Sequence, residues 1–377
     1  MPEPGAAPQS SRETLAFAVA GLFFLVVLPA LNLLPAEDAW FHVSDFRLNQ
    51  FGKFLAFAIL ALGLDLIWGY CGVLSLGQGV FFRLGRLLHG HVSRAANRVR
   101  ERLRERAAGL HGLDPSPRTP LFWYPFKSFW GGFVGAILVP VLFATLFGVL
   151  AFRSRIKGVY FAIITQALAF AAWLVFNRNE TRLGGTNGLT DFKQLLDFRL
   201  SDPSTQRGLY VLTVLALGAA YLLCRWIVAS RAGNVLIAIR DSESRVTFSG
   251  YTPWRYKLFV FVVAAGLAGL AGMLYVPQVG IITPAQIGVL PSLEVVIWVA
   301  VGGRGTLIGA IIGAVAVNYG RSVLTNYFPE AWPFILGGLF VIVVTLFPDG
   351  LIGMIRKLTA RKEPPALRVK AEGGTVT

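Results

Sequence analysis

The chain has 377 residues, of which 55% are hydrophobic and only 15% are charged. Soluble domains carry about 25% charged residues, so this composition excludes a soluble enzyme of this length as well as a disordered chain. The mean hydropathy of +0.61 is typical of an integral membrane protein. The net charge of +15 indicates either a nucleic-acid partner or cytoplasmic loops rich in Lys and Arg.

Apolar stretches long enough to cross a bilayer, about 20 residues each, recur along the chain. We therefore expect an all-α polytopic bundle with about 9–10 membrane segments, several of them broken by Gly or Pro as in transporters. The first stretch lacks a small-residue cleavage site and is expected to be a retained helix rather than a signal peptide. The stretches are Thr14–Leu34, Phe51–Trp68, Phe129–Phe152, Val159–Phe176, Leu209–Val228, Leu258–Val276, Leu290–Val301, Leu307–Leu324 and Trp332–Phe347.

Charged residues are distributed unevenly over the intervening loops. The loops Arg153–Lys157 and Arg225–Lys257 and the tail from Arg356 are basic, so we expect them in the cytoplasm. The segments Glu37–Asp45 and Asn177–Arg207 are acidic or mixed and are expected on the other side. The crossings then alternate consistently to a cytoplasmic C-terminus.

One segment, residues 83–118, breaks this pattern. It holds nine arginines and three acidic residues, and it contains His89, His91 and His111. Its apolar residues repeat at helical spacing, which favours a basic amphipathic helix on the membrane surface. The histidines lack the Cys or acidic framework of a metal site.

Motifs for catalysis and for ATP binding are absent from the sequence. No G-x-x-x-x-G-K-[ST] motif and no nucleophile–base set occurs, so the chain is not expected to bind ATP or act as an enzyme. The glycine-rich stretch Gly266–Gly272 lies inside an apolar span, where small residues favour close helix packing over cofactor binding. Cys71 and Cys224 lie in apolar surroundings and indicate no disulfide framework.

The basic loop Ser230–Lys257 is longer than a connection between membrane helices requires. It has room for a short helix from Val235 to Phe248, followed by a turn at Gly250 and Pro253. The loop is either a solvated charged connection or a docking helix that transmits movement from a partner ATPase.

Ordered motifs then give the chain a resemblance to the permeases of branched-chain amino acid and urea ABC importers. The stretch F-N-R-N-E-T-R-L-G-G-T-N-G-L-T-D-F most resembles the larger of the two urea permease subunits. The other matching stretches are G-Y-C-G-V-L-S-L-G-Q-G-V-F-F (69–82), G-V-Y-F-A-I-I-T-Q-A-L-A (158–169), G-G-T-N-G-L (184–189), A-I-R-D-S-E (238–243), A-G-L-A-G-M-L-Y (268–275), G-G-R-G-T-L-I-G (302–309) and F-P-D-G-L-I-G (347–353).

This resemblance implies a transmembrane permease domain over residues 14–353, located in a bacterial inner membrane. A cytoplasmic N-terminus (1–13) precedes it, the coupling loop (229–257) interrupts it, and a basic cytoplasmic tail (354–377), expected to be disordered, follows it. The implied partners are a second permease subunit, two cytoplasmic ATPases that hold ATP and Mg²⁺, and an extracytoplasmic substrate-binding protein. The chain itself would bind no cofactor, metal or nucleic acid.

The family match also assigns roles within the coupling loop. Residues Ser242–Gly250 would form the coupling helix seated in an ATPase cleft. Arg240, Asp241 and Glu243 would orient this helix through charge-assisted contacts, and Gly250 would allow the sharp exit turn.

Candidate residues of the translocation pathway are polar groups in apolar surroundings. Gln78, Thr165 and Gln166 are expected to face the bundle interior, because intramembrane polar groups tend to do so. Asp65 is an ionisable residue of the second span, and it either lines the pathway or caps or pairs near the helix end. Thr186 and Asn187 lie in a glycine motif that is either a tight outer turn or part of a gate.

Urea is the expected cargo and would serve nitrogen uptake. It is small and neutral, so amide and hydroxyl side chains suit it without a fixed charge. Branched-chain amino acids are the alternative within the same class. A stand-alone channel or a secondary transporter is the alternative from a different class, although a secondary carrier more often shows paired intramembrane acids.

The sequence after Gly85 departs from the family, which continues with an apolar segment beginning G-Y. Codons for Arg86–Asp114 can be chosen so that dropping one base gives G-Y-C-M-G-M-Y-L-V-R-Q-I-G-S-A-N-A-Y-G-N-A-R-P-D-F-M-V-L, which resembles the family's continuation. A restored segment would also supply the crossing that is missing between Phe51–Trp68 and Phe129–Phe152. We therefore expect one extra base near the Gly85 codon and a second indel before about Leu121.

Sequencing of the gene tests this expectation. The codons for residues 86–114, read one base out of step, should encode the apolar string given above. Codons that do not encode it would contradict a displaced reading frame, and the segment would then be a basic surface helix.

Overall fold

The computed structural model describes residues 21–33, 43–87, 129–154, 156, 158–178, 194–195, 198–280, 288–328, 330–346 and 350–359. Several features expected from the sequence lie outside these residues. They are the N-terminus (1–13), residues 88–118 of the basic segment with its histidines, Thr186 and Asn187, and the tail beyond residue 359.

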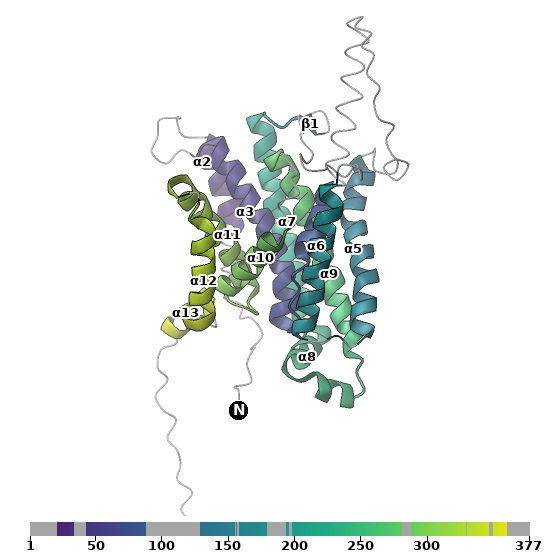
Figure 1. The fold of residues 1–377 in the computed structure, drawn as a ribbon. Coiled ribbons are helices and arrows are strands. Elements are labelled where there is room, and N and C mark those ends of the chain that lie inside the picture. The colour runs from purple at the N-terminus through teal and green to yellow at the C-terminus, as the bar shows by residue number, and fades with distance from the viewer. Residues whose placement is uncertain are drawn as a thin grey trace, which may run out of the picture.

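The described residues form an all-α bundle with one small hairpin, which confirms the predicted fold class (Figure 1). The hairpin pairs β1 antiparallel with β2 and lies between α6 and α7. The elements are η1 (Phe23–Val27), α2 (Leu28–Leu33), α3 (Asp45–Asp65), η2 (Leu66–Tyr70), α5 (Phe129–Arg153), α6 (Val159–Asn177), β1 (Gln194–Leu195), β2 (Phe198–Arg199), α7 (Pro203–Ala229), α8 (Arg231–Phe248), α9 (Pro253–Val279), α10 (Val289–Gly302), α11 (Leu307–Tyr327), α12 (Trp332–Leu346) and α13 (Gly350–Thr359).

Six of these helices are long and apolar enough to cross a membrane, namely α3 with η2, α5, α6, α7, α9 and α11. Three shorter apolar helices, η1 with α2, α10 and α12, account for the remaining predicted stretches. Over its described residues, each apolar stretch identified in the sequence therefore coincides with a helix. In Figure 1, α8 and α13 lie at one end of the bundle, and β1 lies at the other.

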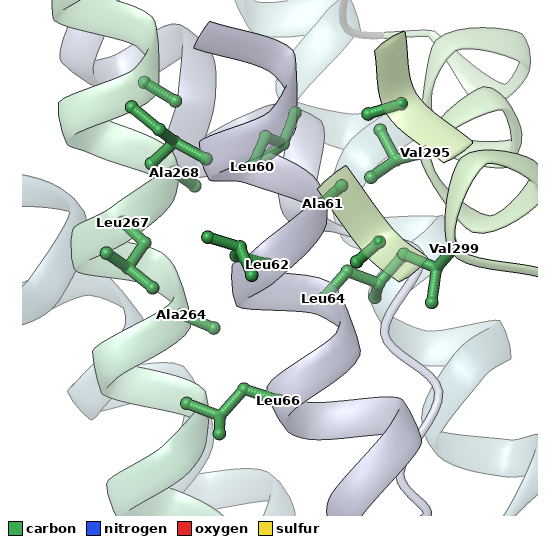
Figure 2. Close-up of a cluster of buried hydrophobic side chains, with 14 of the residues drawn as sticks. Leu60, Ala61, Leu62, Leu64, Leu66, Ala264, Leu267, Ala268, Val295 and Val299 are labelled. Atoms are coloured by element: carbon green, nitrogen blue, oxygen red, sulfur yellow. The ribbon is translucent and has the colours of Figure 1, made fainter. Parts of the chain in front are cut away.

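Helix α3 is at the centre of the bundle. In the most apolar stretch of α3 and η2, 78% of the residues are buried, whereas in the corresponding stretches of α5 and α6 only 28% are buried. Ser44 begins the helix by accepting a hydrogen bond from the Arg47 N–H. Leu60, Leu62 and Leu64 pack between α9 and α10, as Figure 2 shows. Displacing α3 would therefore disturb most of the core.

At the glycine-rich stretch Gly266–Gly272, the backbone of α9 lies very close to the backbone of neighbouring segments. A Cβ atom at Gly269 would lie 2.4 Å from the Ala136 carbonyl oxygen of α5. A Cβ atom at Gly272 would lie 2.0 Å from the Phe82 carbonyl oxygen. Neither distance is sterically possible, which confirms the interpretation of this stretch as a packing surface.

Residues 78–87 form a helix inside the bundle, so the first residues of the basic segment do not lie on the membrane surface. Arg83 and Arg86 are each only 1% exposed. The Arg86 guanidinium lies 4.6 Å from the Tyr275 ring centroid, and that of Arg83 lies 5.0 Å from the Phe176 ring centroid. Such cation–π contacts offset part of the cost of about 2.5–3.5 kcal/mol for an arginine near mid-bilayer.

Helix α8 begins at Arg231, four positions earlier than the sequence predicts. It folds back directly on the end of α7, where a Cβ atom at Gly233 would lie 2.0 Å from the Val228 carbonyl oxygen. The helix is broken at Ser242, whose backbone is extended (φ −160°, ψ 95°). The predicted exit turn is present at Gly250, whose φ of 84° favours glycine.

At the end of the bundle opposite α8, neutral side chains connect α3 to α9 and α9 to α7. The Asn49 Nδ2 group donates to the Gln278 carbonyl oxygen over 2.9 Å. The Gln278 Nε2 group in turn donates to the Thr213 hydroxyl over 2.7 Å.

Candidate functional site

The turn η2, which continues α3 and which we call the end of α3, is held by two arginines from other parts of the chain. The last carbonyls of a helix lack intrahelical donors, and cations there are favourable. Arg240 of α8 donates from Nη1 to the Gly69 carbonyl oxygen over 2.9 Å. Arg304 donates from Nε and Nη2 to the Trp68 carbonyl oxygen over 3.2 and 3.1 Å. Two separate elements thus bind the same helix end.

Asp65 joins this site from within α3. Its Oδ1 accepts a hydrogen bond of 2.7 Å from the Gly305 N–H, in the loop between α10 and α11. The carboxylate is fully buried and is attracted to the nearby Arg304 and Arg240. The capping or pairing alternative considered for Asp65 therefore has a partner in the structure. We call Asp65, Trp68, Gly69, Arg240, Arg304 and Gly305 the α3-end cluster.

The Arg240 side chain also lies against the chain that leaves α3. A Cβ atom at Gly72 would lie 2.9 Å from Arg240 Cγ, so only glycine leaves room for the arginine. Gly72 also has a φ of 77°. The exposed Asp241 carboxylate accepts from Arg240 Nε over 3.2 Å. Burial, together with the like charge of Arg240, lowers the pKa of Arg304.

A second ion pair fixes the other half of α8 to the start of α9. Lys257 Nζ lies 2.8 Å from Glu243 Oε1, and the two side chains are 8% and 24% exposed. Glu243 is the carboxylate that balances the buried Lys257 charge.

The outer surface of α8 beyond the break at Ser242 makes few contacts with the bundle. Phe248 is 91% exposed, and Ser244, Arg245 and Thr247 are also exposed. An exposed aromatic ring beside a basic residue at the turn to Gly250 is a surface that another protein can cover.

Residues 71–77 connect η2 to the helix over 78–87 without regular structure, although alternate residues are buried. The Thr165 hydroxyl of α6 anchors this connection by accepting a hydrogen bond of 3.0 Å from the Leu76 N–H. The same hydroxyl donates to the carbonyl oxygens of Phe161 or Ala162. Irregular backbone at membrane depth is tolerated where it is buried in protein or lines a cavity.

Two amide side chains next to this anchor, Gln78 and Gln166, have buried polar atoms without a hydrogen-bond partner among the described residues. Gln78 is 2% exposed and begins the helix over 78–87. Gln166 follows Thr165 on α6, about 10 Å along the helix from its start at Val159. We call Gln78 and Gln166 the amide pair.

The structure thus places the candidate residues in two groups. Asp65 and Arg240 belong to the α3-end cluster, whereas Thr165 binds residues 71–77, Gln78 follows that segment and Gln166 follows Thr165 on α6. The sequence did not identify Arg304, Gly305 or Lys257 as members of a site. The sequence offered a clue to Arg304 and Gly305, because both lie in the family motif G-G-R-G-T-L-I-G.

Comparison with known proteins supports a transport role. A family model described as branched-chain amino acid transport system / permease component matches residues 46–344. The high-affinity branched-chain amino acid transport system permease protein LivM of Salmonella typhimurium is 25% identical over 86% of this chain and 75% of its own length. LivM of Escherichia coli is 25% identical over 88% of this chain and 75% of its own length.

The permease protein LivH of the same system in Salmonella typhimurium is 21% identical over 79% of this chain and 91% of its own length. No solved structure matches the chain.

The Glu243–Lys257 pair generates a stability prediction. Glu243→Gln leaves the Lys257 charge buried without its partner, and we expect a loss of about 3 kcal/mol in the free energy of unfolding. The control Asp241→Asn removes a carboxylate that is 64% exposed, so we expect a change of less than about 1 kcal/mol.

Unfolding of the two variants in detergent measures the difference. Adding Lys257→Met to Glu243→Gln should recover most of the loss, because no charge then remains buried. Equal stability of Glu243→Gln and Asp241→Asn would contradict the buried ion pair.

Proposed function

The chain belongs to the family of branched-chain amino acid transport system permease components, and we propose that it forms half of the translocation pathway of an ATP-driven importer of urea. It is a multi-pass membrane transport protein and not an enzyme, as its family and the names of its relatives state. The energy source, the cargo and the orientation are the parts that we propose.

We infer that the α8 end of the bundle faces the cytoplasm of a bacterial inner membrane. Basic residues gather on the segments that reach this end, among them Arg153 at the end of α5 and Arg231 and Arg245 on α8. An excess of Lys and Arg marks cytoplasmic loops. Helix α13 lies at the same end of the bundle, so we propose a cytoplasmic C-terminus (Figure 1).

The partners in this proposal are a second permease subunit, two cytoplasmic ATPases that hold ATP and Mg²⁺, and an extracytoplasmic binding protein. The surface of α8 from Ser242 to Gly250 would dock on one ATPase. Phe248 would enter the ATPase cleft, because its ring is 91% exposed and the backbone break at Ser242 separates this half of α8 from the first.

The observation that supports a neutral cargo is the amide pair. Gln78 and Gln166 offer donors and acceptors that no described residue uses, in surroundings where unsatisfied polar atoms are costly. Urea has four N–H groups and one carbonyl oxygen, which two amide side chains can bind without a fixed charge. Thr165 already binds backbone groups, and Asp65 binds Gly305 through Oδ1, although its Oδ2 has no hydrogen-bond partner among the described residues. Because Asp65 lies in the α3-end cluster near Arg304 and Arg240, we assign the contacts of a neutral cargo to the amide pair.

Transport in this proposal changes the exposure of the amide pair between the two sides of the membrane. ATP binding and hydrolysis would move the docked half of α8, and the bundle around residues 71–77 would open toward one side at a time. The motif around Thr186 and Asn187, which lies outside the described residues, supports urea through its resemblance to the larger urea permease subunit.

Branched-chain amino acids are the second candidate cargo. The names of the LivM and LivH relatives favour them. An amino acid carries two charges at neutral pH, however, and neither member of the amide pair is charged.

Phe248 tests the docking surface. Phe248→Asp should reduce co-purification with the ATPases at least tenfold while leaving thermal unfolding unchanged, because the side chain is 91% exposed. The matched control is Phe198→Asp on β2, at the opposite end of the bundle, where the ring is 65% exposed. If Phe248→Asp retains the ATPases as well as the control does, the assignment of α8 is wrong.

Uptake by the complete transporter in proteoliposomes tests the cargo. We expect ATP-dependent uptake of labelled urea and no uptake of labelled leucine. Gln78→Leu and Gln166→Leu should each lower urea uptake about tenfold, which corresponds to one lost hydrogen bond of about 1.4 kcal/mol. The control Gln206→Leu alters an amide that donates to the Leu200 carbonyl oxygen away from the pathway.

The other outcomes separate the alternatives. Leucine uptake without urea uptake would replace urea by branched-chain amino acids as the cargo. Urea uptake that is independent of ATP would indicate a channel or a secondary transporter and would overturn the importer.

A further inference from the structure

We propose that Arg240 is the positioning residue that transmits movement of α8 to the end of α3 and to residues 71–77, and thereby to the amide pair. This inference rests on the proposed function, since it presumes that an ATPase moves α8. It goes beyond docking because the Arg240 side chain, although 33% exposed, donates from Nη1 to the Gly69 carbonyl oxygen of the bundle, whereas the docking surface lies beyond Ser242.

The position of Arg240 in α8 supports this role. Arg240 lies two residues before the backbone break at Ser242, at the end of the first half of α8. Movement of the docked half would reach this residue first. The ion pair between Glu243 and Lys257 connects the docked half only to α9. Arg240 is the described residue of α8 that donates a side-chain hydrogen bond to the end of α3.

The contacts of Arg240 can transmit a displacement of α8 both toward the bundle and away from it. The hydrogen bond from Nη1 to the Gly69 carbonyl oxygen resists separation, because breaking it would leave a buried helix-end carbonyl without a donor. The side chain also abuts Gly72, whose missing Cβ atom would lie only 2.9 Å from Arg240 Cγ. Displacement of Arg240 toward the bundle would therefore displace the backbone at Gly72.

Only a few residues separate the contact of Arg240 with Gly72 from the amide pair. Residues 73–77 separate Gly72 from Gln78, and this backbone has no helical hydrogen bonds that could absorb a displacement. The Leu76 N–H is held by the Thr165 hydroxyl, one residue before Gln166. A shift of Gly72 thus changes the position of Gln78 relative to a fixed point on α6.

Arg304 and Gly305 would transmit the same movement to the loop between α10 and α11. Both bind the end of α3 from the loop between α10 and α11, through the Trp68 carbonyl oxygen and the Asp65 carboxylate. Movement of the α3 end would therefore carry the start of α11 with it. Arg240 acts on both regions because it binds the α3 end that they share.

The test compares cargo transported per ATP hydrolysed in the reconstituted complex. Arg240→Met keeps the packing against Gly72 but removes the donor. We expect it to assemble with the ATPases and to hydrolyse ATP, with at least a fivefold loss of urea transported per ATP. Arg240→Lys retains one donor and should recover part of this ratio. Arg231→Met is the matched control, because Arg231 is exposed at the start of α8 and precedes the docking surface.

Each outcome decides the proposal. A wild-type ratio in Arg240→Met would overturn it, as would failure of both Arg240 variants to assemble with the ATPases, since the contact would then serve folding alone. An equal loss in Arg231→Met would show that any change in α8 uncouples the complex and would also overturn it. If the unmodified complex transports leucine and not urea with ATP, the proposed cargo fails, and leucine transported per ATP in the same variants then decides the role of Arg240.

Discussion

The end of the buried helix α3 imposes the constraint on which the other features of the site depend. Local backbone N–H groups already cap part of this end, since Gly72 N–H donates to the Trp68 carbonyl oxygen and Val73 N–H to that of Ile67. The chain adds donors from α8, where Arg240 binds the Gly69 carbonyl oxygen, and from the α10–α11 loop, where Arg304 binds that of Trp68. Because the donors come from distant elements, the central helix, the basic segment α8 and the start of α11 are connected at one place.

Charged side chains are distributed unevenly along the bundle. The α8 end carries the arginines of the α3-end cluster and the Glu243–Lys257 pair. At the opposite end of α3, Asn49 binds Gln278, and the Asp45 carboxylate accepts a hydrogen bond from Asn32. Between the two ends, the amide pair provides polar atoms without charge. The interior also holds the buried guanidinium groups of Arg83 and Arg86, which lie over the rings of Phe176 and Tyr275. The charged α8 end suits contact with soluble partners.

The fold class and the apolar stretches could be predicted from the sequence because hydrophobic length is a local property. The start of α8 could not, since it depends on the close approach of Gly233 to the end of α7. The inward contact of Arg240 could not be predicted either, because Gly69 lies 171 positions away in the chain. Asp65 and Gly305 are 240 positions apart. Spacing along a sequence does not encode such pairs, although the glycine motifs that contain Gly69 and Gly305 indicated where the chain is crowded.

The most direct test of the central claim is a pair of experimental structures of the complete transporter, with and without a non-hydrolysable ATP analogue. We expect the distance from Arg240 Nη1 to the Gly69 carbonyl oxygen to remain near 2.9 Å in both structures while α8 moves relative to α6. Separation of these two atoms in either structure, with α3 unmoved, would contradict it.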